Sequence, residues 1–408
     1  MHVWLLKIGE PLPGDHDSRL YRMGLLSKEL VSRGHSVVWW TSDFNHKRKS
    51  YRFGKHKIRD NENIQTRFIH SPISYQRSVS ILRVAHDLDL ARRVRNEMLS
   101  QAKLPDLIVV SMPTIELARV AVAVGKLTNT PVAVDVRDMW PDIIPISTSG
   151  LKRLVATLFL PLLKRSLRKT LSSATTVVSI TPEFLNWAQS YKPNVQQAYD
   201  RSFYLSFDSN DDDRLTHSIQ PNLLDLDTGT FVVLFAGTMA SSVCFEHVFV
   251  AARELERSGY SVHFVICGSG DDLETFEQQV QSKNVTFTGE LGTTAIAHLK
   301  QIASAALLPI RPRPDYLMSL SNKFYEYLEA GLPILSLLDG VPGSVLTKNK
   351  CGWVYKDSNE LIQIIKTLYD STDLHSKAAQ RAKNLFHTTF SPDIVYPAFV
   401  SHLETLTD

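Results

Sequence analysis

Hydrophobic and polar positions along the chain form blocks that predict strands and helices in turn. Short apolar runs, typical of buried strands, alternate with longer stretches in which apolar residues recur every three or four positions, as in amphipathic helices. In the first half the predicted strands are HVWLLK, SVVWWTS, NIQTRFI, DLIVVSM, PVAVDV and ATTVVSI, with helices at about 18–34, 79–102, 115–127 and 151–171. Because this alternation requires crossover connections, it predicts a parallel sheet covered by helices.

The pattern stops at about residue 199 and resumes at about residue 230, where FVVLFAG, SVHFVICGSG, NVTFTG, AALLPI and PILSLL again alternate with helices. The polar, acidic segment between predicts a linker over 199–229. We therefore predict two doubly wound α/β domains, 1–198 and 230–389, with a helix at about 390–408 packing back on the first. Ligands of open parallel sheets bind beyond the carboxyl ends of the strands, so a deep cleft between the domains is the predicted site.

Composition limits the class of protein. The length of 408 residues suits two domains, and 43% hydrophobic and 21% charged residues are ordinary for a globular protein. A net charge of +3 gives no reason to expect a nucleic-acid partner. Three cysteines without a CxxC pair indicate a reducing compartment, and the longest apolar segment without charge, Leu154–Leu163, is too short to cross a bilayer. We expect a cytoplasmic protein, or one that lies on the inner face of the cytoplasmic membrane.

The stretch SLSNKFYEYLEAGLPI (319–334) predicts a short helix with a lysine in an unfavourable place. Ser321 suits the N-cap and Gly331 the C-terminal end. Lys323 falls in the first turn, where the helix dipole disfavours a cation by up to about 1 kcal/mol. Either Lys323 pairs with Glu326 on the surface, or an anion binds at this end of the helix.

The preceding loop favours the anion. Arg311 and Arg313 follow the predicted strand AALLPI, and a strand–loop–helix junction with several cations is typical of a phosphate site. A diphosphate would interact favourably with both the dipole and Lys323. The apolar stripe Phe324, Tyr327 and Leu328 is expected to hold the helix against a core.

The motifs now on the page resemble those of a known family. NKFYEYLEAGLPIL is similar to the C-terminal motif of family 4 glycosyltransferases of the GT-B fold. The segments LLSKELVSRGHSVVWWTS, VDVRDMWPD, LFAG, VICGSG, VTFTGEL and CGWVY follow in the family's order. The likeness is greatest to the branch that builds bacterial surface polysaccharides such as O-antigen and capsule, including N-acetylfucosaminyltransferase-like proteins. It implies two Rossmann-like domains facing a cleft, and transfer of a sugar with retention at the anomeric carbon, without a metal ion or another cofactor.

The resemblance also implies site residues. Glu326 matches the glutamate that binds the ribose, and Lys323 the lysine that stabilises the departing diphosphate. Asp138 and Arg137, just past the strand PVAVDV, would shape the sugar and acceptor end, although a local ion pair is an open alternative. The other expected donor-binding residues are Gly14, Gly237, Thr238, Gly268, Gly270, Glu290, Leu291, Arg311, Arg313, Leu320, Ser321 and Asn322.

The chain departs from the family pattern at three places. Met318 stands where the family has a glutamate that contacts the donor sugar. AGTMASSVCFE lacks the Arg and Lys that many members place after the first strand of the C-terminal domain. The family's paired glycines after the first strand of the chain are reduced to Gly14–Asp15.

The expected substrates are a nucleotide-sugar donor, UDP-linked and carrying an N-acetylated amino or deoxyamino sugar, and a lipid-linked or saccharide acceptor. The DLD segments Asp87–Asp89 and Asp225–Asp227 do not follow a buried strand, so no metal site is predicted. A nucleotide-sugar epimerase of the same architecture and a non-catalytic binding or scaffold subunit stay open. The sequence does not define the sugar, the linkage, the oligomeric state or what replaces a glutamate at Met318.

Two basic segments, 46–59 and 151–169, contain seven and six Lys or Arg residues and no acidic residue. The second has an apolar stripe, Leu151, Leu154, Val155, Leu158, Phe159 and Leu162. This stripe either packs in the core or makes a peripheral contact with anionic lipid.

Overall fold

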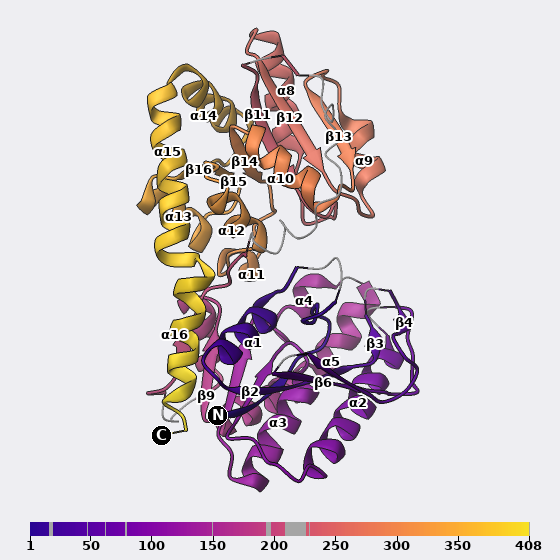
Figure 1. Ribbon diagram of the computed structural model, residues 1–408. Helices are drawn as coiled ribbons and strands as arrows, with labels where there is room; N and C mark the ends of the chain where they lie inside the picture. The colour runs from indigo at the N-terminus through magenta and orange to yellow at the C-terminus, as the bar shows by residue number, and fades with distance from the viewer. Residues whose placement is uncertain are drawn as a thin grey trace. The chain divides into compact units, whose positions relative to one another are not determined.

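The computed structural model describes residues 1–15, 19–46, 48–61, 63–77, 80–148, 150–192, 197–208, 226–227 and 229–407. The chain divides into two compact units: unit 1 comprises Met1–Tyr204 and Val395–Asp408, and unit 2 comprises Leu205–Ile394. Each unit has its own sheet with helices on both faces (Figure 1). Most of the predicted linker, 209–225 and residue 228, lies outside the described residues, as does Asp225 of the second DLD segment.

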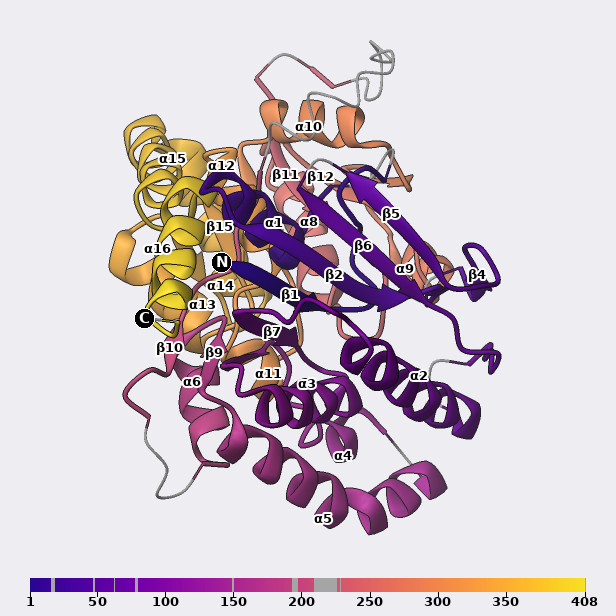
Figure 2. The same cartoon turned by 60° about the horizontal axis from the view of Figure 1, so that its bottom comes forward.

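Unit 1 is built on a sheet with the strand order β10-β9-β8-β7-β1-β2-β6-β5. Neighbouring strands are parallel, except that β5 runs antiparallel to β6. Its strands are β1 (His2–Leu6), β2 (Ser36–Ser42), β5 (Lys57–Asn61), β6 (Ile64–Ile69), β7 (Leu107–Ser111), β8 (Val132–Val136), β9 (Thr176–Ser179) and β10 (Arg201–Ser202), and a small hairpin of β3 (Phe44–Asn45) and β4 (Ser50–Tyr51) is separate from it. Figure 2 shows β5, β6, β2 and β1 side by side.

The six strands predicted in this half are confirmed as β1, β2, β6, β7, β8 and β9. The sequence pattern missed β3, β4 and β10, which have two residues each, and β5, whose KIRDN sequence is mostly charged. Such segments pair through their backbones and have no apolar run to reveal them. Strand β10 lies inside the predicted linker range and extends the sheet of unit 1 beyond β9.

Both faces of this sheet are buried, which explains why its strands are continuous apolar runs. One face packs with α2 (Ile81–Leu99), α3 (Ile115–Thr128), α5 (Gly150–Ser173) and α6 (Pro182–Gln189). The other packs with α1 (Arg22–Ser32) and α16 (Pro392–Glu404). The short helix α4 (Ile144–Ser147) precedes α5.

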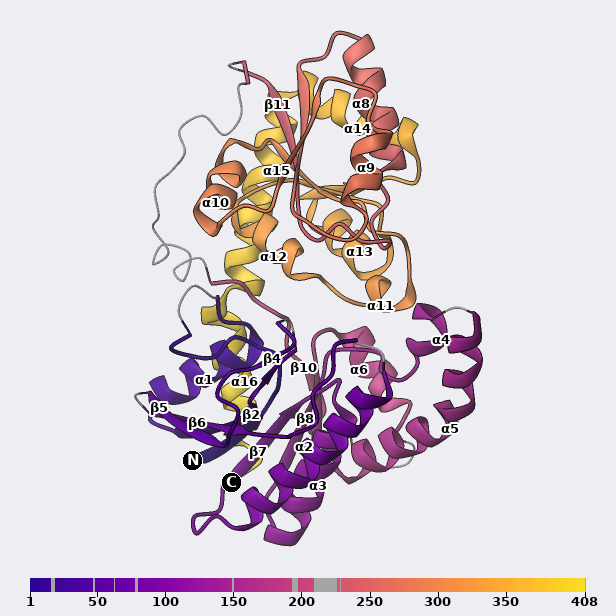
Figure 3. The same cartoon turned by 90° about the vertical axis from the view of Figure 1, so that its right-hand side faces the viewer.

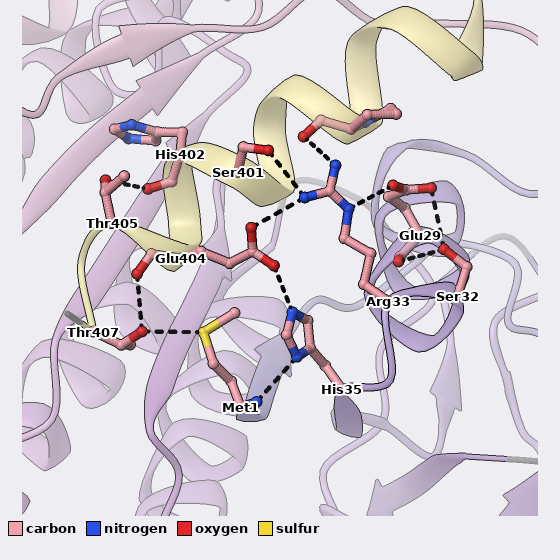
Figure 4. A network of polar contacts seen from close by, with 11 residues as sticks. Met1, Glu29, Ser32, Arg33, His35, Ser401, His402, Glu404, Thr405 and Thr407 are labelled. Atoms are coloured by element: carbon pink, nitrogen blue, oxygen red, sulfur yellow. Dashed lines mark hydrogen bonds and ion pairs between the residues drawn. The ribbon is translucent and has the colours of Figure 1, made fainter.

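The C-terminal helix is fastened to unit 1 by polar contacts as well as by its apolar side (Figure 4). Arg33, just after α1, donates to Glu29, to Ser401 and to Glu404, at 2.9 to 3.0 Å. His35 contacts the other oxygen of Glu404 at 2.9 Å. These contacts join the end of the chain to its beginning within one unit.

Unit 2 has an all-parallel sheet in the order β13-β12-β11-β14-β15-β16. Its strands are β11 (Phe231–Ala236), β12 (Val262–Cys267), β13 (Val285–Gly289), β14 (Ala305–Leu308), β15 (Ile334–Ser336) and β16 (Gly352–Val354). Its helices are α8 (Glu246–Arg257), α9 (Leu273–Gln279), α10 (Thr293–Ile302), α11 (Pro314–Leu317), α12 (Asn322–Glu329), α13 (Gly340–Asn349), α14 (Ser358–Asp370) and α15 (Thr372–Leu385), followed by a π-helical turn, η1 (Phe386–Phe390). The five strands predicted here are confirmed as β11 to β15.

Four of the six residues in the predicted apolar stripe of α5 are exposed, so this part of the stripe does not pack in the core. Leu154, Leu158, Phe159 and Leu162 are 58 to 71% exposed, whereas Leu167 and Leu171 are buried. Among its described side chains, the helix enters the core through Leu167 and Leu171 of its C-terminal half, and Figure 3 shows it following α4 along one side of unit 1. The side chains of Leu151 and Val155 lie outside the described set. Across the described ranges, none of the helices combines the length and apolar character that crossing a bilayer requires.

Candidate functional site

The loops that follow β11 and β12 in unit 2 approach each other at glycine residues. A Cβ on Gly268 would lie 1.8 Å from the carbonyl oxygen of Gly237, and one on Gly270 would lie 2.1 Å from that of Met239. Gly268 and Gly270 also have φ angles of 139° and 156°, which side-chain-bearing residues rarely adopt. The N–H of Gly237 donates to the carbonyl of Cys267 at 2.8 Å. Predicted donor-binding residues from two strands are thus brought into one backbone junction.

Lys323 completes this junction. A Cβ on Gly237 would lie 1.9 Å from Lys323 Cε and 2.4 Å from its Nζ, so the lysine crosses directly over the glycine. The ammonium also lies 5.9 Å from the centre of the Phe235 ring. The cation that the sequence placed in the first turn of α12 therefore lies against the loop after β11, and not simply at the protein surface.

Helix α12 is held rigidly behind Lys323. Phe324, Tyr327 and Leu328 are buried as predicted, and Tyr325 is buried as well. The backbone N–H of Ala236, the last residue of β11, donates to the Tyr327 hydroxyl at 2.9 Å. This contact fixes the register between the helix and the strand that carries Gly237.

Ser321 is the N-cap residue of α12, as the sequence predicted, but it does not cap through its side chain. Ser321 is the N-cap residue with extended backbone, but its side chain accepts no hydrogen bond from the first turn; the N–H of Phe324 reaches its carbonyl at 3.0 Å. Asn322 is exposed beside it and Leu320 is buried. The segment before the helix is fixed elsewhere, because a Cβ on Gly340 would lie 2.5 Å from the carbonyl oxygen of Leu317.

The remaining predicted donor residues flank the junction. Ser269 donates to Glu290 at 3.2 Å, which joins the loop after β12 to the one after β13. Thr238 and Glu290 are exposed, whereas Leu291 packs against a small apolar cluster. Glu326 is partly exposed, one turn after Lys323 on α12.

Arg311 and Arg313 each have a carboxylate partner. Arg311 pairs with Glu246 at 2.5 Å, and Arg313 holds Asp315 through two bonds of 2.6 and 2.7 Å. Burial raises the pKa of Glu246, but hydrogen bonds from Cys244 and Arg311 outweigh this effect and lower the pKa to about 2. Each arginine would have to exchange its carboxylate for a phosphate in order to assist Lys323.

In unit 1, Arg137 pairs with Glu10, which lies far from it in the sequence. Glu10 also accepts the N–H of Met23 at 3.0 Å. Burial would raise the pKa of Glu10, but Arg137 and Lys7 outweigh it and lower that pKa. Asp138 is partly buried at the carboxyl end of β8.

The sequence analysis did not predict the buried charged side chains near Arg137 and Glu10, which are Lys7, Arg22 and Asp135. Lys7, next to β1, donates to the carbonyl of Met112 at 2.9 Å, and burial lowers its pKa to about 8 with Arg137 adding to the effect. Arg22 and Asp135 form an ion pair at 2.9 Å whose side chains are fully buried. The signal available was a carboxylate inside the apolar strand PVAVDV, because such a charge requires a buried partner.

Gly14 has a φ of 81°, and a Cβ there would lie 3.0 Å from Asn61 Nδ2, so the position favours glycine. The next residue, Asp15, pairs with Arg52 at 3.2 Å and Arg59 at 2.9 Å. Two cations of the basic segment 46–59 therefore form ion pairs within unit 1.

These features define what the site in unit 2 can do. A lysine over a glycine junction at a helix N-terminus can bind a diphosphate through charge and backbone geometry. In the described part of the chain, no three His, Cys, Asp or Glu side chains are grouped as metal ligands, and Asp87 and Asp89 lie within α2 as predicted. Metal independence itself stays a prediction.

A curated relative shares part of the chain. The 2-deoxystreptamine N-acetyl-D-glucosaminyltransferase of Niallia circulans is 26% identical over 204 residues, which is 46% of this chain and 49% of that protein. The match thus spans about half the length of the relative. Its own substrates are not thereby assigned to this chain.

Solved structures resemble the chain over its whole length. Sucrose-phosphate synthase of Thermosynechococcus elongatus has a TM-score of 0.74 at 12% identity and covers 100% of this chain and 99% of its own. HepE of Anabaena in complex with UDP has a TM-score of 0.67 at 15% identity, covering 99% and 100%. At these identities the likeness establishes the fold.

Family models match both halves of the chain. A glycosyl transferase 4-like domain matches residues 21–195, and the glycosyl transferases group 1 domain matches residues 219–385. Together the two ranges span most of the 408 residues. The chain therefore belongs to the family 4 glycosyltransferases and has their GT-B fold.

Proposed function

We propose that this protein is a retaining glycosyltransferase that moves a sugar from a UDP-linked donor to a lipid-linked or saccharide acceptor of a surface polysaccharide. The observation that carries the proposal is the junction at which Lys323 crosses Gly237 and Gly237 meets Gly268. UDP in the structure of the similar HepE supports a uridine donor. The name of the Niallia relative supports an N-acetylated amino sugar.

In this mechanism the protein positions the substrates and stabilises charge. The bond from the anomeric carbon to the diphosphate breaks, and the bond to the acceptor oxygen forms on the same face. The acceptor proton passes to the departing diphosphate oxygen. Lys323 stabilises the charge that develops on the diphosphate, and Glu326 holds the ribose hydroxyls.

Unit 1 would supply the acceptor side. Arg137, held by Glu10, is a positioning residue, and Asp138 contacts the sugar or acceptor. No family glutamate is available at Met318, so we assign the hold on the donor sugar to the backbone of 317–321, whose path is fixed by Gly340.

Steady-state kinetics with UDP-sugars and lipid-linked acceptors test the proposal. Lys323→Ala and Glu326→Ala should each lower turnover tenfold or more, about 1.4 kcal/mol, and Lys323→Ala should lower kcat more than it raises KM. Lys377→Ala, at an exposed pair with Asp373 on α15, is the matched control and should be unchanged. Equal activity in all three variants would contradict the assignment.

The products distinguish the alternatives. NMR should show the donor's anomeric configuration in the product, and activity should persist in excess EDTA. Conversion of the donor sugar without any acceptor would indicate an epimerase. UDP binding without turnover on any acceptor would indicate a binding or scaffold subunit.

We also propose that unit 1 docks on an anionic lipid surface through α5. Leu154, Leu158, Phe159 and Leu162 are spaced by four, one and three positions, so they share one exposed side of the helix. Three exposed cations, Arg165, Arg168 and Lys169, follow them, and α5 contains no acidic residue. An apolar stripe beside exposed cations fits the boundary of an anionic bilayer, where each cation contributes about 1 kcal/mol.

Liposome flotation tests this contact. The protein should float with vesicles containing anionic lipid and detach as salt approaches about 1 M. Changing Arg165, Arg168 and Lys169 together to Glu should abolish flotation and leave UDP binding intact. The matched control changes Lys377, Arg381 and Lys383 of α15 to Glu, with the same change in charge. Equal loss in both variants, or no flotation of the wild type at low salt, would disprove docking through α5.

A further inference from the structure

Unit 1 contains a cavity at the end of its sheet that the proposed function does not use. The cavity has a volume of about 350 Å³ and is lined by the first residues of β1 and β2, by the β5–β6 hairpin and by the segment after α2. It therefore lies at the amino ends of the parallel strands, and Figure 2 shows these strand starts beside the N-terminus. Lys7, Glu10 and Arg137 lie beyond the opposite, carboxyl ends.

Two tryptophans line the cavity. Trp4 and Trp40 meet edge to face with ring centres 5.3 Å apart, and both are 1% exposed. The indole N–H of Trp4 donates to His2 Nε2 at 3.3 Å. The indole N–H of Trp40 has no acceptor among the described residues.

The cavity lining carries two cations, Arg67 and Lys103, and one carboxylate, Asp60. The guanidinium of Arg67 lies 5.1 Å from the centre of the Trp40 ring, and its Nε donates to the amide oxygen of Gln65 at 2.8 Å. Arg67 forms no ion pair with a carboxylate within the described part of unit 1. Asp60, which also lines the cavity, accepts from Gln65 at 3.0 Å, and Lys103 is a further lining residue. Burial lowers the pKa of Arg67, against the nearby carboxylates of Glu97 and Asp60, which raise it.

Neutral polar groups complete the lining. Gln65, Gln101, Asn63 and Ser36 offer amides and a hydroxyl, and Ser36 Oγ contacts His2 Nδ1 at 2.8 Å. Side-chain amides and a hydroxyl both donate and accept hydrogen bonds, which suits a ligand rich in hydroxyl groups. The volume is at the small end of ligand pockets, which favours a monosaccharide over a nucleotide sugar.

From these contacts we propose that the cavity binds a monosaccharide that carries one anionic group, either a hexose phosphate or a hexuronate. Arg67, with Lys103, holds the anion. The amides of Gln65 and Gln101 hold hydroxyl groups. The site is separate from the donor site of unit 2 and does not depend on the proposed transfer reaction.

Calorimetric titration with glucose 6-phosphate, glucuronate, glucose and inorganic phosphate tests the proposal. At least one of the two anionic sugars should bind, at least tenfold more tightly than glucose or phosphate, and which one binds identifies the anion. Arg67→Gln should weaken binding tenfold or more. Arg92→Gln, at an exposed position of α2, is the matched control and should bind normally. Tryptophan fluorescence, which reports mainly on unit 1, should be unchanged in both variants and shows that they are folded.

NMR of indole-labelled protein gives a readout on the wild type. One indole N–H resonance should shift on addition of the bound sugar, and this resonance should be missing from Trp40→Phe. Absence of binding by both anionic sugars at 10 mM, on the order expected for a very weak site, would overturn the proposal. Phosphate that binds as tightly as glucose 6-phosphate, or unaltered binding by Arg67→Gln, would overturn it as well.

Discussion

The two units differ in how they carry charge. Unit 1 contains 30 Lys and Arg residues against 19 Asp and Glu, a formal charge of +11, whereas unit 2 contains 15 against 23, a charge of −8. Unit 1 also buries several charged side chains in pairs, such as Arg22 with Asp135 and Lys192 with Asp200. Among the described residues of unit 2, Lys300 is the charged side chain that is buried, and it lies over the Phe207 ring.

The difference extends to the carboxyl ends of the two sheets. In unit 1 the charged side chains near this end of the sheet form ion pairs with one another, as Arg137 does with Glu10 and Arg22 with Asp135. In unit 2 backbone meets backbone at glycines, and one lysine crosses the junction. We infer that unit 2 is arranged for a ligand that brings its own negative charge, and that the ion pairs Arg137–Glu10 and Arg22–Asp135 of unit 1 mainly fix the positions of loops.

Breaking a buried pair of unit 1 should have the largest effect. Arg22→Met leaves Asp135 buried without its cation and removes contacts to the carbonyls of Phe203 and Tyr204. We expect a loss of about 3–5 kcal/mol in the free energy of unfolding of unit 1. Urea unfolding followed by tryptophan fluorescence measures it, because five of the six tryptophans lie in unit 1.

The exposed pair Lys377–Asp373 of unit 2 provides the control, since Lys377→Met should cost less than about 1 kcal/mol. If both substitutions cost the same, the buried charges of unit 1 are not structural.

Filling the glycine junction of unit 2 should have the next largest effect. In Gly268→Ala the new methyl group would lie 1.8 Å from a backbone oxygen, which cannot move like the end of a side chain. Backbone strain and overpacking together should cost about 2–4 kcal/mol in thermal unfolding and abolish UDP binding. Gly292→Ala, with no atom within 4 Å of the added carbon, should behave as wild type. Normal UDP binding by Gly268→Ala would show that the junction is not tight.

The two units also differ in what the sequence could predict. In unit 2 the candidate site could be predicted from local sequence patterns. These are the apolar stripe of α12, the glycines after β12 and Lys323 in the first turn of α12. In unit 1 the pairs Arg22–Asp135 and Glu10–Arg137 join residues more than a hundred positions apart, and no local period relates them. The sequence could not predict that Leu158 and Phe159 are exposed, because an apolar stripe has the same sequence pattern whether or not another element covers it.

The buried lysine of unit 1 predicts a pH effect of intermediate size. The pKa of Lys7 is about 8 in the folded protein and 10.5 ordinarily, so between these values the unfolded chain binds a proton that the folded chain does not. Stability should therefore rise with pH across this window, by up to about 3 kcal/mol. Unfolding free energies of wild type and Lys7→Met, measured at several pH values, should differ by this rise. Parallel pH profiles would show that Lys7 keeps its ordinary pKa.

The smallest effect is expected where the side chain itself can yield. A methyl group on Gly237 would meet Lys323 Cε and Nζ, which can swing aside, and Phe235 at 3.2 Å. Gly237→Ala should therefore fold normally and move the ammonium away from the diphosphate, lowering kcat about tenfold, or 1.4 kcal/mol. Because both changes remove the same interaction, adding Gly237→Ala to Lys323→Ala should cost little more than Lys323→Ala alone. Fully additive losses in this double-mutant cycle would mean that Gly237 serves the donor by its backbone, independently of the lysine that crosses it.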